Sequence, residues 1–373
     1  GTALSNMGGA MGTARDVGAG LMAGGYVAAR AVQKPIAREE RLARLANIGY
    51  SERDKKGRIA GMKELDALAR ETVKTGGGSD EQAIGLLESL MAGGMETDQI
   101  KRLAPGIQKA ATSMGADTGE LATLVVSGLK QGQFKEANVY GILEKMSRAG
   151  ELGSFEGKDI TKWLPQLMAS ASGMRGASGT AEMFAHLEAV RNVTGSSDQA
   201  GNAYDNYLAY LKSPEAAKNL EDYGVNLTKE LIAYNSKGVS TPEAFADILE
   251  KRVVNTNRTV QSLQKRIAQA KTPEERQKLE QQLDIAKKAA ISTVIRDRQA
   301  GLGAAGMILG KDMIASVKKE LASSEGTLQK GFEVIQETTA AKATAFDNTK
   351  TYAASDAFSD VKPHIDRMLD GLR

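Results

Sequence analysis

The chain has 373 residues, which is long enough for roughly two or three domains with buried cores. It contains no cysteine, so disulfides and thiolate metal sites are excluded, and its two histidines, His186 and His364, are far apart. The 49 basic and 46 acidic residues leave a net charge of +3, which is too balanced to predict a nucleic-acid-binding protein.

The hydropathy pattern predicts an all-α fold. Apolar residues recur at three- and four-residue spacing almost throughout, and Leu121–Val126 is the one short run compatible with a strand. Aromatic residues make up 5% of the chain, whereas 40 residues are glycine. Because small side chains let helix backbones approach closely, we expect a multi-helix bundle of short helices with Gly/Ala packing faces.

Residues 1–35 are predicted to form a small-residue N-terminal helix that ends at Lys34-Pro35. The longest apolar run, Val17–Ala29, would rise about 20 Å as a helix, short of the roughly 30 Å hydrocarbon core of a membrane. The sequence begins with glycine rather than methionine and shows no signal-peptide pattern, which favours a fragment of a longer protein. Residues 36–61 are predicted to be a charged helix followed by a linker.

Residues 62–240 are predicted to be a domain of about seven or eight short helices. Glycine costs about 1 kcal/mol inside a helix, so glycines here are expected at helix ends. Breaks are expected at Gly76–Gly78, Gly93–Gly94, Ala104-Pro105, Gly115, Gly132, Gly150–Gly157, Gly173–Gly179 and Gly195. Ser213 and Thr241, each followed by Pro-Glu, have the pattern of a helix N-cap with proline in the first turn.

Residues 241–300 carry the pattern of a long antiparallel αα-hairpin. Two apolar seams flank the break at Thr272-Pro273, and Glu275 completes a capping box with Thr272. The seams are Val253, Val260, Leu263, Ile267 and Ala270 before the break, and Leu279, Leu283, Ala286, Ala290 and Val294 after it. Two helices of nearly equal length joined by so short a link bury both seams by folding back. The alternative is one continuous rod kinked at Pro273.

Residues 301–373 are predicted to form Gly/Ala-rich C-terminal helices. Gly303, Gly306 and Gly310 have a small-residue spacing that permits close helix contact inside a bundle in water and drives helix association in a membrane. We expect the small-residue faces at Gly18–Gly25 and Gly301–Gly310 to support homo-oligomerisation. No long, uninterrupted helix of the kind that measures length at about 1.5 Å per residue is predicted anywhere in the chain.

Several short motifs from Glu151 onward follow one another in a characteristic order. They are Trp163-Leu164-Pro165-Gln166-Leu167, Ser172-Gly173-Met174-Arg175-Gly176, Gly179-Thr180, Asn219-Leu220, Tyr223-Gly224-Val225-Asn226-Leu227, Gln299-Ala300-Gly301-Leu302-Gly303 and Gly306-Met307-Ile308-Leu309-Gly310. This order resembles the helical domain of phage tail tape-measure proteins, in which such helices precede a Gly-Val-x-[Leu/Val/Ile] turn. The resemblance covers roughly residues 60–350. It implies that Trp163, the only tryptophan, is a structural anchor between two helices.

The resemblance implies a structural, non-enzymatic component of a phage or prophage tail, located in the tail-tube lumen or tip and, during assembly, in the host cytoplasm. It implies roles in tail length determination, tail assembly and genome delivery, with the length-setting segment elsewhere. Implied partners are further copies of the chain, with a trimer favoured, tail tube and tip or baseplate proteins, tail assembly chaperones and a host membrane on ejection. No specific nucleic acid is expected. The alternatives are a membrane-active, pore-forming helical protein and a muralytic enzyme.

Three patterns invite a chemical interpretation, and each is better explained structurally. Glu182 and His186 have a spacing that a metal can use, but no second histidine is near, so a surface or half-buried histidine is expected. Glu88-Ser89 lacks the following segment and the cleft aromatics of a lytic transglycosylase. Gly306–Lys311 lacks the hydroxyl residue and preceding strand of a phosphate loop. We therefore predict no catalytic, cofactor-binding or metal-binding residue, and no cofactor.

Overall fold

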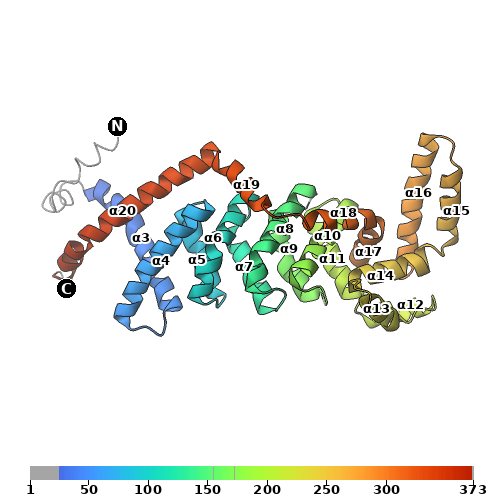
Figure 1. Cartoon of the computed structure of the whole chain (residues 1–373), viewed down its shortest axis with the longest axis horizontal. Helices are drawn as coiled ribbons and strands as arrows, with labels where there is room; N and C mark the ends of the chain where they lie inside the picture. The colour runs from blue at the N-terminus through green and yellow to red at the C-terminus, as the bar shows by residue number, and fades with distance from the viewer. Residues whose placement is uncertain (1–24, 154, 172, 372–373) are drawn as a thin grey trace. The chain divides into compact units, whose positions relative to one another are not determined.

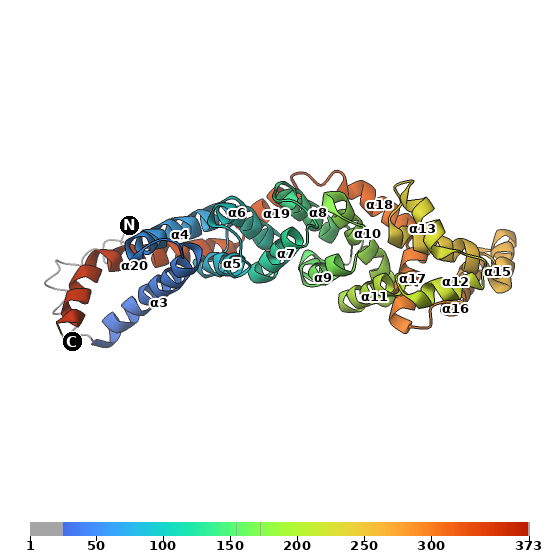
Figure 2. The ribbon, with the colours of Figure 1, turned by 90° about the horizontal axis from the view of Figure 1, so that it is seen from below.

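The computed structural model describes residues 25–153, 155–171 and 173–371, and every regular element in these ranges is a helix. The predicted all-α fold is confirmed (Figures 1 and 2). The described residues form two compact units: unit 1 comprises the residues up to Gln108 and from Glu333 onward, and unit 2 comprises Lys109–Phe332. Most of the predicted small-residue N-terminal helix, residues 1–24, lies outside the described residues.

The described part of unit 1 is built mainly from five helices, of which α6 continues into unit 2. They are α3 (Gly25–Gly49), α4 (Lys55–Gly76), α5 (Asp80–Ala92), α6 (Thr97–Met114) and α20 (Thr339–Asp370). The predicted segment 301–373 therefore supplies helices to both units. At 32 residues, α20 is also a longer helix than the sequence pattern predicts. Its many alanines and the absence of glycine between Thr339 and Asp370 favour this continuity.

Two predicted breaks at proline are wrong. Both α3 and α6 continue through Pro35 and Pro105. In α3 the buried positions Pro35, Arg38 and Leu42 share one face, and in α6 Ile100 and Ile107 are fully buried. Because burying these faces stabilises a continuous helix, tertiary packing outweighs the lost backbone hydrogen bond at each proline.

Polar contacts attach α20 to the rest of unit 1. The Asn348 side chain accepts a hydrogen bond from the Asp80 N–H (2.9 Å) and donates one to the Gly78 carbonyl (2.8 Å). Arg70 pairs with Asp356 of α20 at 2.6 Å. A side-chain amide that satisfies two backbone groups next to a helix start fixes the position of α20 over α5.

Unit 2 contains the remaining elements, with α19 continuing into unit 1. They are α7 (Thr118–Lys130), the 3₁₀ turn η1 (Glu136–Asn138), α8 (Val139–Leu152), α9 (Gly157–Ser170), α10 (Gly176–Thr194), α11 (Ser197–Tyr210), α12 (Pro214–Glu221), α13 (Leu227–Asn235), α14 (Thr241–Leu249), the π-helical turn η2 (Glu250–Val254), α15 (Arg258–Gln269), α16 (Pro273–Ser292), α17 (Arg298–Leu309), α18 (Lys311–Leu321) and α19 (Thr327–Gln336). The cap at Ser213 is confirmed, because its hydroxyl accepts from the Ala216 N–H. At the start of α14 the N-cap is Ser240, one residue before the predicted Thr241.

The core of unit 2 forms where α17 packs against α10 and α11. A Cβ added at Gly303 would lie 2.5 Å from the Ala203 carbonyl oxygen, and one at Gly306 would lie 2.6 Å from the Val190 Cα. The small-residue face of Gly303 and Gly306 is therefore buried inside unit 2. Its expected use as a surface between copies is wrong, since a face already in backbone contact with neighbouring helices is not free to meet a second chain.

Trp163 joins α9 to α11, in agreement with its predicted role as an anchor. Its indole N–H donates to Asp198 at 3.1 Å, and the ring covers Gly201, where a Cβ would lie 2.2 Å from the nearest ring atom. The absence of a side chain at Gly201 is what lets the indole lie flat on α11.

The predicted antiparallel hairpin is present as α15 and α16, which pack along each other (Figure 1). The predicted equal lengths are wrong, since α15 has 12 residues and α16 has 20. Val253, assigned to the first seam, is buried in η2 before the hairpin begins, and Asn257 caps α15. At the turn, the Thr272 hydroxyl accepts from the Glu275 N–H, while the Glu275 carboxylate accepts from the Lys271 N–H.

We expect substitution of Leu279 by aspartate to unfold the hairpin locally, because Leu279 is 3% exposed and a buried carboxylate costs several kcal/mol. Ile285→Asp on the same helix is the matched control, since Ile285 is 70% exposed. Hydrogen exchange of the α15 and α16 amides measures both variants. Equal protection in the two would contradict the packing of α15 on α16.

Candidate functional site

A cluster of polar and charged side chains in unit 2 is centred on His186 of α10. Its ring is fully buried, with 0% exposure, so the expectation of a surface or half-buried histidine is wrong. The Glu182 carboxylate lies one helical turn away, as the spacing predicts, with its Oε1 3.7 Å from the His186 Nε2. Burial of this turn follows from the position of α10, which packs against α8, α11, α17 and α18 and so leaves little of its surface exposed.

Two other helices complete the cluster around His186. Glu243 of α14 places its Oε1 3.2 Å from the His186 Nε2, and the Tyr204 hydroxyl of α11 lies 2.6 Å from the Nδ1. Burial raises the pKa of Tyr204 well above its usual value, so this phenol stays protonated. A Tyr204 hydroxyl that donates to the Nδ1 leaves the Nε2–H to donate to Glu243.

The ammonium group of Lys318 of α18 is shared by the two carboxylates. Its Nζ lies 2.8 Å from the Glu243 Oε1 and 3.3 Å from the Glu182 Oε1, and the Ser240 hydroxyl donates to Glu182 at 2.6 Å. Burial acts to raise the pKa of Glu243, but hydrogen bonds from His186 and Lys318 outweigh it and lower the pKa to about 2. The two carboxylates, the His186 imidazole and the Lys318 ammonium thus connect α10, α14 and α18.

Three of these side chains have the composition of a metal site. Single ligand atoms of Glu182, His186 and Glu243 lie within 4.8 Å of one another. The cation between the carboxylates is the Lys318 ammonium, however, and a metal would have to displace it and take the Nε2 lone pair. The carboxylates of Glu182 and Glu243 already have a protein cation and hydrogen-bond donors as partners. The cluster therefore fits an internal ion-pair network better than a metal centre.

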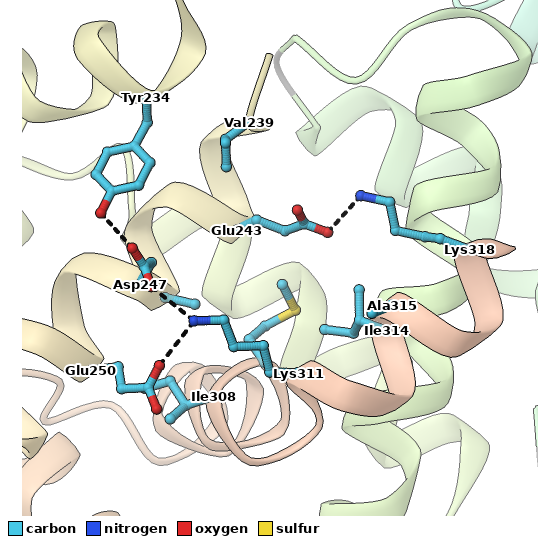
Figure 3. A pocket seen from close by; sticks show the side chains of 12 residues that line it. Tyr234, Val239, Glu243, Asp247, Glu250, Ile308, Lys311, Ile314, Ala315 and Lys318 are labelled. Carbon is cyan, nitrogen blue, oxygen red and sulfur yellow. Dashed lines mark hydrogen bonds and ion pairs between the residues drawn. The ribbon is translucent and has the colours of Figure 1, made fainter. Parts of the chain in front are cut away.

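A cavity of about 450 Å³ lies beside this network, between α14 and the helices α17 and α18. Figure 3 shows the Glu243–Lys318 contact at one end and Lys311 between Asp247 and Glu250 at the other. The Lys311 Nζ lies 2.8 Å from Asp247 and 3.1 Å from Glu250, so this lysine serves an ion pair rather than a phosphate loop. Apolar side chains line the space between the two ends.

The Glu88-Ser89 pair does not have the geometry of a hydrolytic acid. Glu88 is 40% exposed and pairs with Arg41 at 2.6 Å, and the Ser89 hydroxyl donates to the Gly85 carbonyl. A general acid of this kind lies in an apolar pocket that faces the substrate, whereas the Glu88 carboxylate is partly exposed and paired with a guanidinium.

The sequence pattern singled out only two members of the unit 2 cluster, Glu182 and His186. Tyr204, Glu243 and Lys318 come from other helices, at sequence separations for which no local periodicity exists. Glu243 was visible only as the acidic residue of a helix start.

Comparison with known proteins identifies a protein family and a relative. The family model described as phage-related minor tail protein matches residues 64–292. A "Probable tape measure protein" of Burkholderia phage BcepMu is 27% identical over 303 residues, covering 79% of this chain and 34% of that protein. The chain thus spans about a third of the length of this relative. No solved structure matches the chain.

Proposed function

The chain belongs to the phage-related minor tail protein family, and from this premise we propose that it is the folded helical part of a tape-measure protein, located in the tail-tube lumen or tip. The observation that carries the proposal is the match over 303 residues to a probable tape measure protein. The family match runs from α4 to α16 and includes His186, Tyr204 and Glu243.

In this role the chain contributes to tail length determination, tail assembly and genome delivery. A length-setting helix needs a long run at about 1.5 Å per residue, and α20, with 32 residues, extends about 48 Å. The other described helices have 25 residues or fewer. The length-setting segment is therefore proposed to lie mainly outside the described residues, which form folded units instead.

The proposed partners are further copies of the chain, as a trimer, together with tail tube and tip proteins and tail assembly chaperones. Contact with a host membrane on ejection is part of the same proposal. The face formed by Gly303 and Gly306 does not support the oligomer, because it packs inside unit 2. Exposed apolar side chains such as Ile232 and Ile285, which are 64% and 70% exposed, are the better candidates for contacts between copies.

A membrane-active protein is the second candidate, and one observation favours it. No single helix in the described part of the chain is long and apolar enough to cross a membrane, but α17 and α18, bent by 71°, reach that length and composition as a pair. Their buried residues include Ala304, Ala305 and Ile314, so insertion would require unfolding this core. Dye leakage from liposomes exposed to the chain tests this candidate, and zymography tests a muralytic activity.

We expect an epitope inserted after Gly238, in an exposed turn, to be detected in purified virions only after the tail tip is opened. Immunogold electron microscopy of intact and opened tails measures this, with an epitope on a tube subunit as the accessible control. Labelling along the outside of intact tails, or the absence of the chain from virions, would contradict the proposed location.

A further inference from the structure

The stretch from η2 to the turn of the hairpin is strongly basic, although the whole chain is nearly neutral. Between Glu250 and Glu274 the sequence contains six basic residues and no acidic one. Lys251 pairs with Asp247 at 2.6 Å and Arg252 with Glu230 at 3.1 Å. The other four are exposed and form no ion pair with any residue that the structure describes: Arg258, Lys265, Arg266 and Lys271.

Three of these charges lie on α15, away from or flanking the face that packs on α16, and Lys271 lies in the turn that follows α15. Val260 and Leu263 are buried and mark the face that packs on α16. At 100° per residue, Arg258 and Lys265 lie opposite that face, and Arg266 lies at its flank. The turn end of the α15–α16 pair projects beyond the other helices of unit 2 (Figure 1), while the opposite end of α16 packs on α17. An outward row of unpaired cations on a projecting helix is open to a large ligand.

The neighbouring side chains fit a phosphate backbone. Gln261, Ser262 and Gln269 are exposed on α15 and add neutral hydrogen-bond donors between the cations. Arg, Lys, Gln and Ser are the side chains that contact phosphate oxygens in protein–DNA complexes. The same face holds no large apolar side chain to insert into a membrane and no aromatic anchor for a protein interface.

We propose that the outward face of α15 binds the phosphate backbone of nucleic acid, without reading its sequence. By contrast, α16 carries acidic residues such as Glu280 and Asp284 beside Lys278 and Lys288. Its positive electrostatic potential is therefore weaker than that of α15. The net charge of the whole chain does not reveal this basic surface, because acidic residues elsewhere in the sequence offset it. Since the inference depends on charge and geometry alone, its failure would leave the tail-protein assignment intact.

The strength of binding follows from the number of phosphates contacted. Four contacts predict that the logarithm of the association constant falls with the logarithm of salt concentration at a slope of about −3.6. The affinity therefore drops roughly 150-fold between about 50 and 200 mM salt.

The test is fluorescence anisotropy of a labelled duplex of about 30 base pairs, titrated with the whole chain at a series of NaCl concentrations. The variant R258Q/K265Q/R266Q removes three cations from exposed helix positions, and R258K/R266K keeps their charge. The matched control K218Q/K229Q/K237Q removes three exposed lysines from the same unit away from the hairpin. Far-ultraviolet circular dichroism checks that each variant remains helical.

We expect the α15 variant to bind at least tenfold more weakly at about 50 mM salt, with a slope near −0.9, while the control and R258K/R266K stay within about twofold of the parent. An undetectable interaction of the parent chain, or equal losses in the α15 and control variants, would overturn the proposal. Binding to phosphatidylserine vesicles or polyglutamate without binding to the duplex would also overturn it.

Discussion

Replacement of Gly303 by alanine is expected to destabilise unit 2 by about 2 to 3 kcal/mol, and replacement of Gly306 by leucine by more. The added Cβ at Gly303 would lie 2.5 Å from the Ala203 carbonyl oxygen and 2.6 Å from the Tyr207 Cβ. Backbone atoms of a packed helix cannot rotate out of the way, so α17 must move away from α11 and open the core. The midpoint of urea unfolding, followed by circular dichroism, measures the loss.

Gly301 on the same helix provides the matched control. The nearest atom to an added Cβ there is the Ile295 carbonyl oxygen at 3.7 Å, an ordinary contact. Gly301→Ala is therefore expected to be neutral or to stabilise by about 0.5 to 1 kcal/mol, because alanine favours a helix interior. Similar midpoints for Gly301→Ala and Gly303→Ala would show that α17 does not pack closely on α11.

The tail phenotype of such variants has a different origin from the one that the sequence suggested. If this face joined copies of the chain, as the sequence suggested, leucine at Gly303 and Gly306 would separate the copies while each monomer stayed folded. Because both glycines contact helices of their own unit, defective tails in this variant would follow from unfolding of unit 2.

The second large effect is expected on replacement of Lys318 by methionine. This change leaves Glu182 and Glu243, which are 13% and 25% exposed, without their shared cation. We expect a loss of about 2 kcal/mol at pH 7, reduced from the value for a fully buried pair because Lys318 is 40% exposed. Lys319→Met, at the adjacent exposed position, is the control and is expected to change little.

The pH dependence of the free energy of unfolding distinguishes a contribution of this ion-pair network from one of apolar packing. The pKa of Glu243 is lowered to about 2 in the folded chain, below its ordinary value of 4.5, so its stabilisation is complete above about pH 4.5 and is lost as the pH falls toward 2. The difference between the parent and Lys318→Met should therefore shrink in acid. Urea unfolding at pH 7, 4 and 3 measures it, and E182Q/E243Q/K318M should recover stability at pH 7. A difference that stays constant with pH would contradict the network.

Local sequence was sufficient for the fold class and for many helix ends. Ser213 and Thr272 cap helices as their spacing predicts, and Gly115 and Gly195 have the positive φ that a helix end requires. The hairpin was also predictable, because its two seams and the turn between them lie within one short stretch of chain. Such features depend on interactions between residues a few positions apart, which the sequence displays directly.

Only the tertiary structure decided which faces are buried and against what. Pro35 and Pro105 continue helices because packing outweighs a missing hydrogen bond, and Gly303 and Gly306 face neighbouring helices rather than another chain. His186 acquires partners from two other helices, Tyr204 of α11 and Glu243 of α14, and Lys318 of α18 pairs with the same Glu243. The physical reason is that burial and charge pairing depend on distances in space, and side chains from distant helices have no common period along the chain.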